Sequence, residues 1–168
     1  HNSWSAEDSS HFYHLPLWGE GAFSVLEEGD LAVKIARGAD TAEVSLASIV
    51  SEYAGRGVNT PLLLRFPDLL ASNISKLNAA FLAAIKEAGS SQTYRGVFPV
   101  KVNQQRQVIE HIAAAGEDCH FGFEVGTKPE LILAMAHIGA GDRFLVCNGY
   151  KDAAYVDLAL SARSVGIN

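Results

Sequence analysis

The sequence has few of the features that mark secreted, metal-binding or membrane-spanning proteins. Its two cysteines, Cys119 and Cys147, belong to no CxxC pair and have no histidine at metal-ligand spacing, so a zinc site is not expected. The first ten residues are polar, which argues against a signal peptide or membrane anchor, and every apolar run is too short to span a bilayer. We therefore expect a cytoplasmic protein with reduced thiols and no membrane partner.

Basic charge and phosphate-binding loops are also scarce. The chain has 13 Lys and Arg against 19 Asp and Glu, a net charge of −6, which argues against nucleic acid as a partner. No Walker motif and no GxGxxG occurs, so a nucleotide-binding interpretation lacks its fingerprint. With 48% hydrophobic residues in 168, the composition is that of a globular protein with one domain or parts of two.

The N-terminal part is expected to contain a disordered segment followed by β structure. Residues 1–14 are mostly small and polar, and we predict disorder for them. Residues 15–60 are predicted to start a β domain, because apolar side chains alternate in the segment 31–35. A short amphipathic helix is expected at 46–53, directly after Ser45.

From residue 61 to residue 168 the pattern alternates between strands and helices. Strands are predicted at 62–66, 97–102, 121–125 and 144–147, each followed by a helical apolar period that ends at a glycine. Asp68 is expected to cap the first of these helices, and Thr127-x-x-Glu130 has the spacing of a capping box on the third.

This alternation predicts an α/β fold with parallel strands covered on both faces. An open doubly wound sheet and a closed barrel both satisfy the pattern. A complete eight-unit barrel needs roughly 250 residues, so a barrel in this chain would be incomplete.

Functional groups of such folds lie at the carboxyl ends of the strands. Lys101 is unusual there, because it is predicted to lie inside an apolar strand. It could be a lysine whose head reaches water, or a desolvated amine that attacks an aldehyde. Glu124 ends the neighbouring strand, either as a structural ion-pair partner or as a carboxylate that steers proton transfer. The helix start at Thr127 is first a cap and second a candidate anion site.

Five sequence blocks resemble those of the biosynthetic (SpeA-type) arginine decarboxylases, which belong with the alanine-racemase-like enzymes that use pyridoxal phosphate (PLP). They occur in the family's order and spacing: LWGEG at 17–21 with Phe23, LRFPDLL at 64–70, GVFPVKVNQQR at 96–106, FGFEVGTKPEL at 121–131 and CNGYKD at 147–152. Departures are mild, with phenylalanine at 98 where tyrosine is usual and Val-Gly-Thr at 125–127 where Ala-Gly-Ser is usual.

The resemblance implies a partial PLP-binding TIM-like (β/α)8 barrel, preceded by the first strands of a β domain. It implies decarboxylation of L-arginine to agmatine, an entry to polyamine and spermidine synthesis, with PLP and magnesium as cofactors and a homo-oligomer at full length. Lys101 matches the lysine that binds PLP as a Schiff base, and Glu124 matches the acidic residue close to the cofactor. Both are the implied catalytic and cofactor-binding residues, and no magnesium ligand is identified.

Several groups that such a site needs are not found in the sequence, including a phosphate-binding loop and a partner for the pyridine nitrogen. We expect the 168-residue chain alone to be inactive. Three alternatives stay open: a decarboxylase of ornithine or diaminopimelate, a non-catalytic PLP-binding protein, and a doubly wound binding domain without a cofactor, which would leave Lys101 unexplained.

Overall fold

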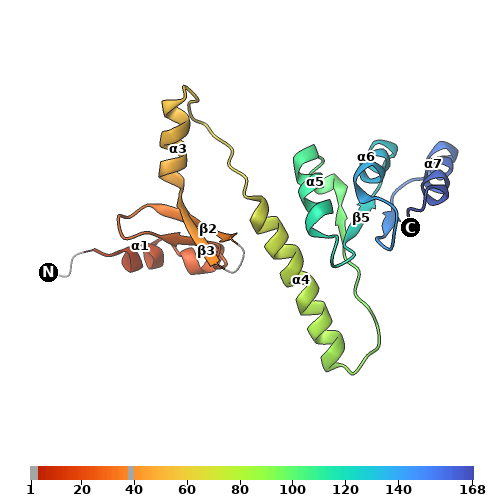
Figure 1. Cartoon of the computed structure of the whole chain (residues 1–168), viewed down its shortest axis with the longest axis horizontal. Helices are drawn as coiled ribbons and strands as arrows, with labels where there is room; N and C mark the ends of the chain where they lie inside the picture. The colour runs from red at the N-terminus through yellow and green to blue at the C-terminus, as the bar shows by residue number, and fades with distance from the viewer. Residues whose placement is uncertain (1–3, 38–39) are drawn as a thin grey trace. The chain divides into compact units, whose positions relative to one another are not determined.

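The structure is a computed structural model that describes residues 4–37 and 40–168 (Figure 1). The chain divides into two compact units, His1–Leu69 and Leu70–Asn168. No helix in the described ranges is both long enough and apolar enough to cross a membrane.

The first unit is built around a three-stranded antiparallel sheet in the order β1-β2-β3. Its elements are α1 (Ala6–Phe12), α2 (Leu15–Trp18), β1 (Phe23–Val25), β2 (Leu31–Arg37), β3 (Asp40–Ser45) and α3 (Leu46–Gly55). The strand expected at 31–35 is β2, and the helix expected after Ser45 is α3. The Ser45 hydroxyl caps this helix by accepting a hydrogen bond from the Ser48 amide at 3.0 Å.

The prediction of disorder for residues 1–14 is wrong for the segment that forms α1, and residues 1–3 lie outside the described part. Ser5 and Asp8 form a reciprocal capping box, with the Ser5 amide donating to Asp8 Oδ2 at 2.8 Å and the Asp8 amide donating to Ser5 Oγ at 3.2 Å. The rings of Trp4 and Phe12 meet edge to face at 5.8 Å. Local capping and aromatic contacts therefore order a segment whose polar composition indicated disorder.

The second unit is a parallel α/β layer, in agreement with the predicted alternation. Its elements are α4 (Pro67–Glu87), β4 (Val97–Pro99), the short 3₁₀ helix η1 (Val100–Val102), α5 (Arg106–Ala115), β5 (Gly122–Val125), α6 (Lys128–Ile138), β6 (Leu145–Cys147) and α7 (Ala153–Ser164). The strands pair in the order β4-β5-β6, all parallel. Helices α5, α6 and α7 follow one another in the same order along the sheet (Figure 1).

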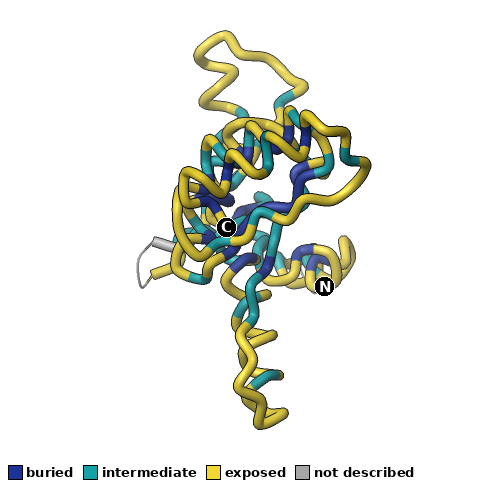
Figure 2. Tube along the Cα trace, turned by 90° about the vertical axis from the view of Figure 1, so that its right-hand side faces the viewer, coloured by how far each residue is buried: buried dark blue, intermediate teal, exposed yellow. Residues whose placement is uncertain are grey.

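The core of this unit lies between the sheet and these helices. Phe123 and Val125 of β5 are fully buried, as is Val100 directly after β4. The side chains that cover them come from the three helices, principally Ile109, Ile112, Leu131, Ala134, Ile138 and Tyr155. Figure 2 shows these buried stretches in dark blue, whereas most of α4 is exposed.

A close backbone approach beside β5 explains why residue 122 is glycine. A Cβ atom at Gly122 would lie 2.0 Å from the carbonyl oxygen of Phe144, and that oxygen accepts the ladder hydrogen bond from the Phe123 amide at 3.0 Å. Any side chain at position 122 would push the strands apart.

Three predictions about elements need correction. The segment 62–66 is not a strand, because no segment in the described ranges pairs with it, and an extended chain without a partner has no ladder. The strand expected at 97–102 ends at Pro99, which has no N–H for a ladder, and η1 follows. Asp68 lies in the first turn of α4 rather than before it, because the helix begins at Pro67.

Candidate functional site

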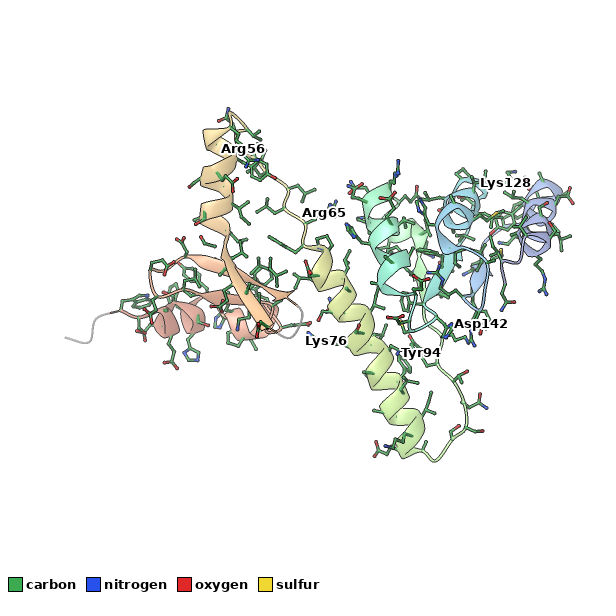
Figure 3. All side chains as sticks on the ribbon, viewed as in Figure 1. Arg56, Arg65, Lys76, Tyr94, Lys128 and Asp142 are labelled. Atoms are coloured by element: carbon green, nitrogen blue, oxygen red, sulfur yellow. The ribbon has the colours of Figure 1, made fainter. Side chains whose placement is uncertain are left out.

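The carboxyl ends of β4, β5 and β6 lie at one edge of the parallel sheet, which we call the carboxyl edge. It comprises the segments 99–104, 124–130 and 147–152. In Figure 3, Lys128 marks this edge at the start of α6, and Asp142, which precedes β6, marks the opposite edge. The sequence-predicted residues Lys101 and Glu124 both belong to the carboxyl edge.

Lys101 lies in η1, two residues beyond the end of β4. The prediction that it lies inside a strand is therefore wrong, and of the two alternatives for its side chain, the exposure of Lys101 in this chain agrees with a head that reaches water. Its neighbour Val100 is fully buried in the core, and the Asn103 amide donates to the Val100 carbonyl at 3.2 Å. This turn fixes the backbone around Lys101 and directs its side chain away from the packed interior.

Glu124 is a buried carboxylate on the strand next to β4. It pairs in register with Pro99 of β4 on one side and with Val146 of β6 on the other. Lys101 follows Pro99 by two residues, so both side chains belong to the same sheet edge. Only 9% of the residue is exposed, yet its carboxylate has no hydrogen bond or ion pair within the described ranges. Every fully buried side-chain nitrogen or oxygen in the described part of the chain has a hydrogen-bond partner, so the Glu124 carboxylate keeps contact with solvent at the carboxyl edge.

Glu130 forms a second buried carboxylate at this edge. Its Oε2 accepts from the Gly126 amide at 2.7 Å and its Oε1 accepts from Gln104 Nε2 at 3.2 Å. The Thr127 hydroxyl accepts from the Glu130 amide at 3.3 Å, so the predicted cap by Thr127 is confirmed. Glu130 differs from a capping box, since it reaches back to Gly126 instead of Thr127. These amides already have acceptors and a carboxylate stands among them, which disfavours an anion site here.

The loop after β6 is joined to the end of β5. The Val125 carbonyl oxygen accepts from the Asn148 amide at 2.8 Å and from the Tyr155 hydroxyl at 3.0 Å. Gly149 has φ of +74° and lies so close to Gly126 that a Cβ on it would come within 3.2 Å of the Gly126 carbonyl oxygen. The loops of the carboxyl edge are thus connected backbone to backbone, and no sequence motif marked these connections.

Burial raises the pKa of the Tyr155 phenol, and the neighbouring Cys147 adds to the increase. The phenol is therefore neutral over the physiological range and acts as a hydrogen-bond donor.

The other two lysines of the carboxyl edge already have partners. Lys128 forms an ion pair with Asp152 at 2.5 Å, and hydrogen bonding from Lys128 lowers the pKa of the Asp152 carboxyl. Lys151 donates to the carbonyl oxygens of Asn148 and Gly149, with its Nζ 4.3 Å from the centre of the Tyr155 ring. Lys101, by contrast, makes no ion pair or hydrogen bond with any residue in the described part of the chain.

No metal centre is visible at this edge. Across residues 4–37 and 40–168, no group of three or more His, Cys, Asp or Glu side chains is arranged to hold a metal ion. The two cysteines are both free thiols, with Cys119 half-buried and Cys147 exposed.

Comparison with known proteins places this arrangement in a family. Residues 74–167 match the sequence model of the pyridoxal-dependent decarboxylases, pyridoxal binding domain. The chain is 44% identical over 165 residues to the biosynthetic arginine decarboxylase of Prochlorococcus marinus, with 98% of this chain and 25% of that protein covered. It is 46% identical over 178 residues to arginine decarboxylase 1 of Oryza sativa subsp. japonica, with 99% of this chain and 25% of that protein covered.

A solved structure gives the same result. The crystal structure of the biosynthetic arginine decarboxylase SpeA from Campylobacter jejuni superposes with a TM-score of 0.85 at 31% identity, covering 93% of this chain and 25% of that one. The chain thus spans about a quarter of the length of these relatives. Because the family match covers more than half of its residues, the chain belongs to the pyridoxal-dependent decarboxylases and carries sequence of their pyridoxal-binding domain.

Proposed function

We propose that this chain is the lysine-bearing part of a PLP-dependent enzyme that decarboxylates L-arginine to agmatine and CO2. The relatives support the substrate, since those proteins are named as arginine decarboxylases. The observation that carries the proposal is that a lysine just after β4 and a carboxylate at the end of β5 lie at the same sheet edge, and neither is engaged by a described residue.

The residues at this edge fit PLP. A primary amine is needed to bind the cofactor's aldehyde, and Lys101 is the edge lysine whose amine is not engaged by described residues. When bound, PLP supplies a conjugated ring that takes up the electron pair left on the α carbon as CO2 departs. The protein's task is then to hold the cofactor and the substrate in orientation and to manage protons.

Lys101 and Glu124 have complementary roles in this proposal. The Nζ atom of Lys101 would hold the cofactor's aldehyde carbon and would carry a proton when it is released from the cofactor. The carboxylate of Glu124 favours the positively charged form of groups beside it, because an anion in a partly buried site stabilises a nearby cation. Glu124 therefore assists proton movement at the edge without forming a covalent bond.

We further propose that the three βα units are consecutive parts of a TIM-like barrel. The order β4-β5-β6 is that of sequential parallel neighbours, and the Leu145 amide donates to the carbonyl oxygen of Asn168 at 2.8 Å. This hydrogen bond and the isolated parallel bridge between Gly141 and Ile167 support a further parallel strand beside β6, as a barrel would require. On this proposal, the phosphate-binding loop and the pyridine-nitrogen partner belong to the remaining length of the full protein, which acts as a homo-oligomer.

No magnesium ligands are assigned to the residues that the structure describes. The ion prefers octahedral oxygen ligands, and no suitable cluster occurs in the described part of the chain. No step of the proposed reaction passes through magnesium.

Trapping the cofactor on the full-length protein tests the proposal. Reduction with borohydride in the presence of PLP, followed by peptide mapping, should place the label on Lys101. Assays of arginine, ornithine and diaminopimelate should show release of CO2 from arginine. Label on another lysine would refute the assignment of Lys101, and turnover of ornithine or diaminopimelate instead of arginine would refute the substrate.

Lys128→Ala provides a matched control for Lys101→Ala. Both changes remove a lysine from the carboxyl edge, but Lys128 is paired with Asp152. Lys101→Ala should abolish trapping, whereas Lys128→Ala should retain it.

A further inference from the structure

We propose that Glu130 is a positioning residue that fastens the loop carrying Lys101 to the strand carrying Glu124. This inference rests on the proposed function, because it assigns Glu130 a role in the same site. Glu130 itself does not touch the reacting atoms in this proposal. It acts by hydrogen bonding to two neighbouring segments, through the backbone amide of Gly126 and the side chain of Gln104.

The two oxygens of Glu130 reach different strand ends. One accepts from the Gly126 amide, two residues after Glu124, at 2.7 Å. The other accepts from the side chain of Gln104, three residues after Lys101, at 3.2 Å. With Glu130 6% exposed, water competes little for these bonds, so they hold the two segments together.

The loop from β4 to α5 is therefore held on both sides of Lys101. On one side, Val100 is fully buried in the core. On the other side, the side-chain NH2 of Gln104 donates to Glu130. The Asn103 side chain also accepts a hydrogen bond from the Gln105 backbone amide at 3.0 Å, which tightens the turn. Loss of the Glu130 carboxylate would free one side while leaving the Val100 anchor in place.

The chemistry of the two partners explains why a carboxylate suits this position. Gly126 and Gln104 both present N–H donors, and an ionised carboxylate is an acceptor at both oxygens. A glutamine at position 130 could still accept from Gly126. Its NH2 group could then donate to the Gln104 carbonyl oxygen after the Gln104 amide rotates by half a turn. An alanine at position 130 could do neither.

Glu130→Ala, Glu130→Gln and Ser45→Ala in the full-length holoenzyme test this role. Ser45→Ala is the matched control, because it removes a helix cap in the other unit. Glu130→Ala should lower kcat on the order of 10- to 100-fold, since small displacements of reacting groups have effects of this size. The rate of borohydride trapping at Lys101 should fall with it, and Glu130→Gln should restore most of both.

Amide hydrogen exchange gives a readout that does not depend on turnover. Glu130→Ala should speed exchange at Gly126 and in the segment 101–104, whereas Ser45→Ala should leave both segments unchanged. The inference is overturned if Glu130→Ala lowers thermal stability as Ser45→Ala does but leaves kcat, trapping and exchange at wild-type values. It is also overturned if Glu130→Gln is as impaired as Glu130→Ala.

Failure of the proposed function would look different. If wild-type protein traps no PLP at Lys101, the function assigned to the site is wrong. The exchange comparison would then still report whether Glu130 joins the two segments.

Discussion

The hydroxyl of Tyr155 in α7 donates a hydrogen bond to the carbonyl oxygen of Val125, the last residue of β5, at 3.0 Å. Tyr155 is 2% exposed, and the same carbonyl oxygen accepts from the Asn148 amide. One buried backbone atom thus joins a strand end, the following loop and a helix. Because Glu124 directly precedes Val125 in β5, this hydrogen bond helps to fix the backbone that carries the Glu124 carboxylate.

Replacing Tyr155 with phenylalanine should lower the free energy of unfolding by about 1 kcal/mol, the ordinary net value of a hydrogen bond. The effect should be no larger, because Asn148 still satisfies the Val125 carbonyl. The midpoint of chemical denaturation of the full-length protein measures this change. A variant as stable as wild type would show that the contact contributes nothing.

The raised pKa of Tyr155 predicts a loss of stability at alkaline pH. Its folded pKa lies above the ordinary value of 10.0, so the unfolded chain releases this proton first. The contribution is fully present below pH 10 and declines as pH rises through that value toward the folded pKa. Denaturation midpoints of wild type and Tyr155→Phe should therefore converge above pH 10. A constant difference across this range would contradict the assignment.

The stabilisation that Asp152 gives to the fold should be lost in strong acid. Hydrogen bonding from Lys128 lowers its folded pKa below the ordinary value of 3.8, so its contribution is present above that value and is lost as pH falls through the folded pKa. Asp152→Asn keeps an acceptor for the Tyr155 amide at the start of α7 but removes the ion pair. Wild type should therefore exceed Asp152→Asn in stability at neutral pH and match it in strong acid.

A single methyl group at Gly122 should separate β5 from the chain before β6. Gly122→Ala places a Cβ atom 2.0 Å from the Phe144 carbonyl oxygen, and overpacking of this kind costs about 3 kcal/mol. Gly55→Ala is the control, because no atom lies within 4 Å of its Cβ position. Denaturation of full-length variants should show a large loss for Gly122→Ala and almost none for Gly55→Ala.

The alternation of apolar strands and amphipathic helices was sufficient to predict the second unit. The helical spacing of apolar residues and the glycines that end helices are features of the local sequence. Helices α5, α6 and α7 end at or just before such glycines. The same signals failed at 62–66, because a strand also needs a partner, which local sequence does not reveal. They also failed at α1, where Ser5 and Asp8 cap a segment that has no buried residue.

The sequence predicted at which sheet edge the candidate residues lie, but it did not predict how exposed or how hydrogen-bonded their side chains are. The rule that polar groups follow parallel strands placed Lys101 and Glu124 at one edge. It did not predict that Pro99 ends β4 early and leaves Lys101 in an exposed turn. The bond between Gln104 and Glu130 joins residues 26 positions apart, and no periodic pattern encodes such a contact.

The buried carboxylate of Glu124 should be required for catalysis but not for attachment of the cofactor. We expect Glu124→Gln in the full-length enzyme to lower kcat on the order of 100-fold, the usual contribution of a residue that assists proton transfer. Borohydride trapping at Lys101 should persist, because the amide is nearly the same size and the carboxylate makes no hydrogen bond to a described residue that the fold needs. Glu110→Gln, which removes a carboxylate paired with Arg106 on the surface of α5, should retain full activity. If Glu124→Gln keeps wild-type kcat across the pH profile, Glu124 has no part in proton movement.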